Sequence, residues 1–186
     1  MNSRVENEIT TRVRRLPLLD KEPQTLAELF LSAVRKAPRK DALNYKKNDE
    51  WHSISSVEML SRIENIALGL FSIGLRKDDK AAILAANSPE WTLCDAGCQF
   101  AGIIDVPVYT TLAPEAVSYI IKDSGAKIFF LQDKAAFERL GDTFSEGETA
   151  QKFFFFDSTD LAADNAISLT ELEPPGAKLK NEQPAS

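Results

Sequence analysis

Apolar residues follow two alternating patterns through the middle of the chain. Short, nearly continuous apolar runs are typical of strands buried on both faces of a parallel sheet. Four such runs are residues 81–86, 103–109, 126–131 and 152–156. Apolar residues at helical spacing occupy residues 89–101, 114–124 and 134–140 between them. This alternation predicts an α/β fold, a mainly parallel sheet with helices on both faces and right-handed crossovers.

Cap signals support the boundaries of the first of these helices. Pro89 suits the first position of a helix, which makes Ser88 the expected N-cap. Asn87 is a second candidate cap, because Glu90 follows it at the spacing of a capping box. Gly102 lies where a left-handed residue would end the helix.

A helix and a β-hairpin are expected before the sheet. A capping box at Thr25 opens an amphipathic helix that Pro38 ends. Residues 42–46 and 51–54 flank a turn-rich segment and predict the hairpin, although the favoured Asn-Gly turn is absent. A second capping box at Ser55 opens another amphipathic helix, which leads toward the first parallel strand.

The two ends of the chain differ from its middle in composition. Residues 1–24 are polar and mixed in charge, and we expect a flexible arm. Residues 173–186 are polar and contain prolines, and we expect a linker or a frayed end. Residues 25–172 then form the predicted α/β unit.

Charge and cysteine content narrow the partners and the compartment. A net charge of −6 argues against nucleic acid or an anionic membrane as the main partner, because both bind a basic face. No apolar run approaches the roughly 20 residues of a membrane span, and the N-terminus lacks a signal-peptide core. Two cysteines in a chain without a secretory signal favour the cytoplasm, where thiols stay reduced. Arg12, Arg14 and Arg15 leave contact with a membrane surface as the alternative.

The chain lacks the usual signatures of catalysis. Its eight glycines form neither of the common phosphate-binding loops, and its one histidine, His52, has no cysteine or second histidine at metal-ligand spacing. Cys94 and Cys98, four residues apart on a predicted helix, fit small core residues better than a redox pair. We therefore predict no catalytic, cofactor-binding or metal-ligating residue in this segment.

Candidate substrate-lining residues come from the ends of the predicted strands. Ligands of open parallel sheets bind beyond the carboxyl ends of the strands. Those ends are Asn87, the pair Tyr109 and Thr110, and the pair Gln132 and Asp133. We select Asn87, Tyr109 and Thr110 as the candidate lining.

Four stretches of the chain resemble the N-terminal part of AMP-forming acyl-CoA synthetases, and most of all the long-chain fatty acid ligases. They are WHSISSVEML (51–60), KDDKAAILAANSPEW (77–91), FAGIIDVPVYTTL (100–112) and VSYIIKDSGAKIFFLQD (117–133). The sequence departs from the family pattern at three places. Asp78 replaces a usual glycine, Ser56 a usual aromatic residue, and Thr110 a proline that long-chain members often carry.

The resemblance implies a two-step ligase reaction in a longer protein. A fatty acid and ATP give an acyl-adenylate and pyrophosphate, and coenzyme A then displaces AMP to form the thioester. The resemblance puts the family's phosphate-binding loop, its magnesium and ribose contacts and its catalytic lysine beyond residue 186. The segment is then an incomplete part of a larger ligase domain: scaffold and a wall of the acyl pocket, inactive alone.

Two other expectations depend on what surrounds the segment. The rest of the ligase chain is the expected partner, and self-association is expected through the face that the remaining strands would cover. ATP, magnesium and coenzyme A belong to the full-length protein, and its location is the cytoplasm or the periphery of a membrane. The alternative function is a free-standing α/β interaction or dimerisation module without catalysis.

Overall fold

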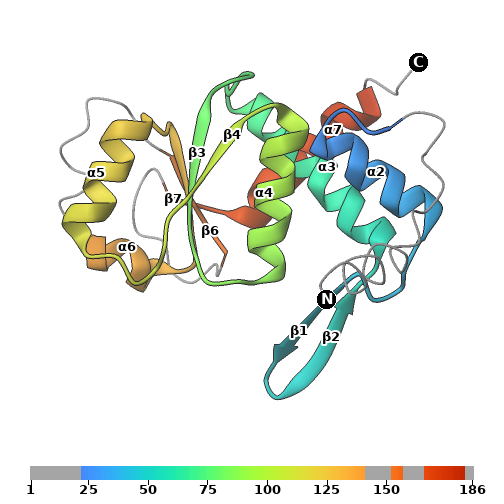
Figure 1. The fold of residues 1–186 in the computed structure, drawn as a ribbon, viewed down its shortest axis with the longest axis horizontal. Coiled ribbons are helices and arrows are strands. Elements are labelled where there is room, and N and C mark those ends of the chain that lie inside the picture. Colours follow the sequence, from blue (N-terminus) through green and yellow to red (C-terminus); the bar gives the residue numbers. More distant parts are fainter. Residues whose placement is uncertain (1–21, 141–151, 157–165, 183–186) are drawn as a thin grey trace, which may run out of the picture.

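The computed structural model describes residues 22–140, 152–156 and 166–182 (Figure 1). The strands are β1 (Leu43–Lys47), β2 (Glu50–Ile54), β3 (Lys80–Leu84), β4 (Ile104–Pro107), β5 (Ile128–Leu131), β6 (Lys152–Phe155) and β7 (Ala166–Ser168). The helices are α2 (Leu26–Lys36), α3 (Ser56–Ser72), α4 (Pro89–Ala101), α5 (Pro114–Ser124), α6 (Lys134–Leu140) and α7 (Leu169–Glu182). In these ranges no helix is long and apolar enough to cross a membrane. Residues 1–21, which make up most of the predicted arm, lie outside these ranges.

Five strands form one parallel sheet in the order β4-β3-β5-β6-β7. The register places Ile83 of β3 beside Pro107 of β4 and Phe130 of β5, and Phe130 beside Phe154 of β6. The four predicted parallel strands are confirmed, and β7 adds a fifth beside β6. The chain enters the sheet at β3, moves outward to β4 and returns past β3 to β5, so crossover helices fall on both faces.

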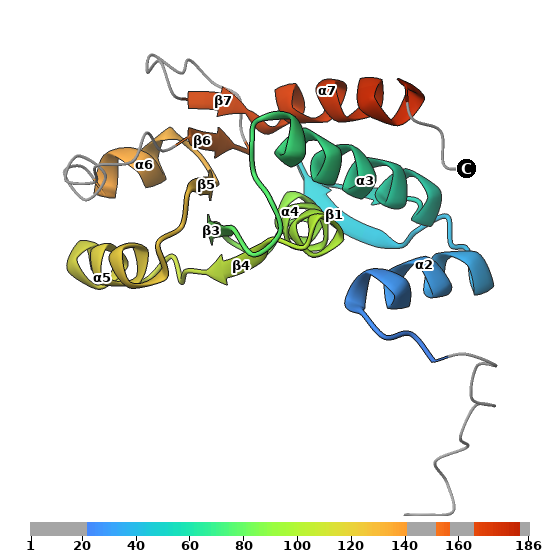
Figure 2. The same cartoon turned by 90° about the horizontal axis from the view of Figure 1, so that it is seen from above.

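Alternate residues of each strand supply two separate cores, because successive side chains point to opposite faces. Ala81 and Ile83 pack with apolar residues of α3, α4 and α7. Ala82 and Leu84 pack with those of α5 and α6 on the other face. Figure 2 shows these two groups of helices on opposite sides of the sheet. Burial on both faces explains why β3, β5 and β6 read as nearly continuous apolar runs, whereas the edge strand β4 is only partly buried.

The hairpin projects from the body of the domain (Figure 1). Strands β1 and β2 pair antiparallel, with Lys47 opposite Glu50 across a two-residue turn. The turn residues Asn48 and Asp49 have φ angles of 51° and 63°. Two positive φ angles are typical of a type I′ turn. The Asn-Asp pair therefore forms the kind of turn that Asn-Gly forms more often.

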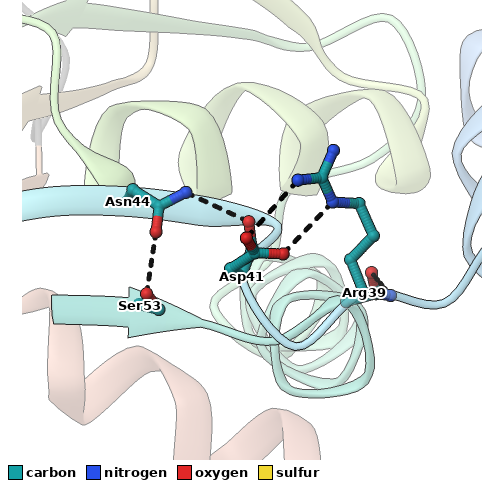
Figure 3. Close-up of polar contacts among 5 residues, drawn as sticks. Arg39, Asp41, Asn44 and Ser53 are labelled. Carbon is teal, nitrogen blue, oxygen red and sulfur yellow. Dashed lines mark hydrogen bonds and ion pairs between the residues drawn. The ribbon is translucent and has the colours of Figure 1, made fainter.

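Ser56 connects the base of the hairpin to the body of the domain. It stands where the family that the sequence resembles usually has an aromatic residue. Ser56 is 4% exposed. The amide of Arg39 donates to Ser56 Oγ (2.9 Å), and the Ser56 amide donates to the carbonyl oxygen of Arg39 (2.8 Å). Figure 3 shows the polar contacts that continue from Arg39 through Asp41 to Asn44. The two bonds between Arg39 and Ser56 thus join the segments before and after the hairpin.

The C-terminal segment corrects the sequence prediction. Residues 173–182, expected as a linker or frayed end, continue α7, which packs along α3. Arg62 of α3 bonds Glu173 (Nη2–Oε1 3.0 Å), and both side chains are largely shielded from solvent. A side chain at Gly176 would overlap the backbone of Asn65, so the two helices touch closely there. The prediction was wrong because Pro174 and Pro175 weigh against a helix in the sequence, whereas tertiary contacts hold this one.

Asp78 takes the backbone conformation that explains the family's glycine. Its φ is 70°, in the left-handed region that glycine adopts without strain. The Asp78 amide donates to the carbonyl oxygen of Gly102 (2.9 Å), which joins the connection before β3 to the end of α4. The aspartate is therefore held in a conformation that a glycine would adopt without strain.

Candidate functional site

The candidate site is the edge of the sheet at which β3, β4 and β5 end. Strand β3 lies between the other two and all three run in the same direction, so their carboxyl ends meet. The Val108 amide donates to the carbonyl oxygen of Ile83 (2.9 Å), and the Gln132 amide donates to that of Leu84 (3.3 Å). The three segments that follow these strands therefore lie side by side where ligands of parallel sheets bind.

Asn87, Tyr109 and Thr110 lie on these segments, and all three are exposed. Tyr109 is 80% exposed, an unusual amount for so large a ring. The structure brings the three residues to one edge, but no hydrogen bond within the described ranges joins their side chains. Their role as substrate lining stays a prediction.

The amino terminus of α4 opens at the same edge. Ser88 Oγ accepts a hydrogen bond from the Trp91 amide (3.1 Å), so Ser88 rather than Asn87 is the cap. Pro89 has no amide proton to offer a ligand, and Glu90 places negative charge in the first turn. This helix end is therefore poorly suited to a phosphate, and Asn87 is not used as a cap.

Gln132 makes a contact that sequence reasoning missed. Its Oε1 accepts a hydrogen bond from the Ala86 amide (3.0 Å), one residue before Asn87. The next residue, Asp133, caps α6 by accepting from the Ala136 amide (2.7 Å). The sequence marks Gln132 as a strand end, but the bond to Ala86 depends on the register of β3 and β5.

The residues with reactive side chains lie elsewhere. Cys94 and Cys98 are free thiols buried in the core between the sheet and α3. Burial raises the pKa of both thiols well above the ordinary value, so they stay protonated and poorly nucleophilic. Their interpretation as small core residues is confirmed. The ring of His52 stacks on Tyr45 of the hairpin, with ring centroids 5.4 Å apart.

A pair of carboxyl groups is a second feature that the sequence did not reveal. Asp95 of α4 and Asp105 of β4 lie close together, and Gln99 Nε2 donates to Asp95 Oδ1 (3.0 Å). Burial, and then the Asp105 carboxyl, raise the pKa of Asp95. Asp95 therefore holds its proton more firmly than an exposed aspartate does. A strand and a helix supply the two residues, so no local spacing marks them.

Comparison with known proteins places the chain in a family. Residues 30–186 match the AMP-binding enzyme family, and the chain belongs to it. Curated relatives include the long-chain-fatty-acid–CoA ligase ACSBG1 of Mus musculus and that of Homo sapiens, each 33% identical over 129 residues, 69% of this chain. The long-chain-fatty-acid–CoA ligase heimdall of Drosophila melanogaster is 30% identical over 122 residues. The chain spans about a fifth of the length of these relatives, 18% in each case.

Solved structures show the same fold. Coronafacic acid ligase from Pectobacterium brasiliense superposes with a TM-score of 0.68 at 21% identity, over 80% of this chain and 29% of that one. The anthranilate–CoA ligase AuaEII in complex with anthranoyl-AMP gives a TM-score of 0.70 at 15% identity, over 82% and 29%. The family resemblance and the α/β fold expected from the sequence are therefore both confirmed.

Proposed function

We propose that the chain is the N-terminal region of a long-chain fatty acid–CoA ligase. In the whole protein, a carboxylate oxygen of the fatty acid attacks the α-phosphorus of ATP, forming the acyl-adenylate and releasing pyrophosphate. The thiol of coenzyme A then attacks the acyl carbonyl carbon, forming the thioester and releasing AMP. The observation that carries this proposal is the family match over residues 30–186, together with relatives named as long-chain-fatty-acid–CoA ligases.

Within that protein, we assign the chain to scaffold and to one wall of the acyl pocket. Support comes from the three strand ends that meet at one edge, where Asn87, Tyr109 and Thr110 are exposed. The pocket of a small-molecule site combines apolar surface with a few placed polar groups. The Tyr109 ring suits contact with an acyl chain, and the Asn87 amide and Thr110 hydroxyl suit hydrogen bonds to its polar end.

ATP, magnesium and coenzyme A enter this proposal as reactants and cofactor of the whole protein. The residues that the structure describes do not suit a phosphate or metal site. The described ranges contain no group of three His, Cys, Asp or Glu side chains placed to hold a metal ion, and the α4 terminus presents Glu90. Stabilising the charge of phosphoryl transfer requires donors and a metal gathered around the phosphates. We therefore assign those groups to the remainder of the ligase, and we expect the chain alone to be inactive. Its two free cysteines fit a cytoplasmic location.

The test uses the protein at the length its gene encodes. It is incubated with ATP, magnesium, coenzyme A and fatty acids of graded chain length, and acyl-CoA and AMP are measured by mass spectrometry. Equal amounts of the two products, greatest with long chains, are expected. Activity confined to short or aromatic acids would contradict the substrate class. Absence of both products would contradict the ligase.

A free-standing interaction module is the competing function. It is favoured by the outer edge of β4, which pairs with no other strand in the described ranges and carries Ile104, 47% exposed. Trp51 of the hairpin is 75% exposed. A reading frame that ends at residue 186, with a stable dimer in sedimentation experiments, would favour this function over the ligase.

A further inference from the structure

We propose that Gln132 is a positioning residue of the candidate site: its side chain holds the turn after β3 in the shape that presents Asn87. This inference rests on the proposed function, because it assumes that Asn87 lines the substrate pocket. It adds a residue that contacts no substrate itself and acts through the backbone of Ala86.

Gln132 is bonded to the end of β3 at two points. Its amide donates to the carbonyl oxygen of Leu84 (3.3 Å), and its Oε1 accepts from the amide of Ala86 (3.0 Å). The first bond continues the pairing of β3 with β5, whereas the second extends it beyond the last paired residue. One side chain therefore takes the place of a neighbouring strand for the turn that leads to Asn87.

The backbone of Gln132 is held on both sides, so the point from which its side chain reaches toward Ala86 is fixed. The preceding residue, Leu131, is fully buried, and its carbonyl oxygen accepts from the Phe156 amide (2.9 Å). The following residue, Asp133, is fixed as the cap of α6 through Ala136 (2.7 Å). Only the Gln132 side chain has to be ordered for this bond to form, because the backbone that carries it is already held.

Asn87 lies between two anchored neighbours. Ala86 is held by Gln132, and Ser88 is held as the cap of α4 by the bond from Trp91. Asn87 itself is exposed at the carboxyl edge. Loss of the Gln132 oxygen releases one of the two anchors, so the position of Asn87 changes while the sheet and α4 stay intact.

The first experiment measures the bond directly in this chain. Gln132→Met has a similar length and no strong acceptor, whereas Gln132→Glu keeps an oxygen at the same position. Amide hydrogen exchange, followed by NMR, is expected to be at least tenfold faster at Ala86 in the Met variant and close to wild type in the Glu variant. Exchange at Ile83 and Phe130 in the sheet should be the same in all three proteins. Unchanged exchange at Ala86 in the Met variant would overturn the proposal.

The second experiment measures the effect on substrate binding and turnover in the ligase at the length its gene encodes. Gln132→Met is expected to raise KM for the fatty acid severalfold, with kcat within twofold of the wild-type value. Gln132→Glu is expected to have a KM close to that of the wild type. Asn87→Ala, measured in parallel, separates the two claims. If Asn87→Ala raises KM and Gln132→Met does not, the positioning role is overturned while the site stands. If neither variant changes KM although Ala86 exchanges faster, the assignment of Asn87 to the pocket fails, and this inference fails with it.

Discussion

Replacing Gly176 by alanine tests whether the C-terminal helix is a packed part of the domain. Gly176 is buried where α7 lies along α3. A methyl group there would overlap the carbonyl group of Asn65. Because the overlapped atoms belong to the backbone of α3, no side-chain rotation relieves the clash, and α7 has to move away from α3.

Two effects of opposite sign decide the result. In a frayed or exposed helix, replacing glycine by alanine raises helix propensity and stabilises by about 1 kcal/mol. In a packed site, overpacking costs about 1–3 kcal/mol. Movement of α7 also loosens the packing of Leu172, which is 2% exposed, and the contact of Arg62 with Glu173. The second effect is the larger, so we expect a net loss of up to about 2 kcal/mol.

The assay is urea denaturation followed by tryptophan fluorescence, which reports through Trp51 and Trp91. Glu171→Ala is the matched control, because Glu171 is exposed on the same helix; its free energy of unfolding should change by less than about 0.5 kcal/mol. An increase in stability for Gly176→Ala would refute the packing of α7 on α3 and restore the frayed end that the sequence predicts.

Two further substitutions test other features of the fold. Asp78→Gly should raise the free energy of unfolding by about 0.5–1 kcal/mol. It removes the strain of an aspartate at φ 70°, and part of that gain is offset by the greater entropy of glycine in the unfolded chain. Asp78→Ala keeps the strain and should show no such gain in the same denaturation assay. Asp95→Asn should make stability less dependent on pH, because the raised pKa of Asp95 makes the wild type lose stability as pH rises above the ordinary aspartate value of 3.8. Denaturation at pH 4 and pH 7 should show an advantage of the Asn variant that grows with pH, and an advantage that shrinks would contradict the raised pKa.

The sheet and its helices were predictable because their signals are local. Buried parallel strands read as apolar runs, and the caps at Ser88 and Gly102 appear in the structure where the spacing places them. The hairpin was found from its two apolar segments even without an Asn-Gly turn, since Asn48 and Asp49 both tolerate positive φ. The candidate edge followed from the strand ends alone.

The parts that the sequence did not reveal depend on contacts between distant segments. The pair of prolines at 174 and 175 weighs against a helix locally, but packing against α3 outweighs that preference. The bond from Ala86 to Gln132 joins residues 46 apart in the sequence. Whether Asn87, Tyr109 and Thr110 meet a substrate depends on what covers this edge, which local patterns do not specify.

Formation of the acyl-adenylate, measured as pyrophosphate release with a long-chain fatty acid, ATP and magnesium, tests the central claim most directly. The assay compares the 186-residue chain with the protein at the length its gene encodes, and each with a heat-treated control. We predict fatty-acid-dependent release by the protein at its encoded length and none above the control by the chain. The reason is that phosphoryl transfer needs donors and a metal around the phosphates, and the described residues hold no group of side chains placed to bind a metal ion. Turnover by the chain alone, or a gene-length protein that releases no pyrophosphate, would contradict the account.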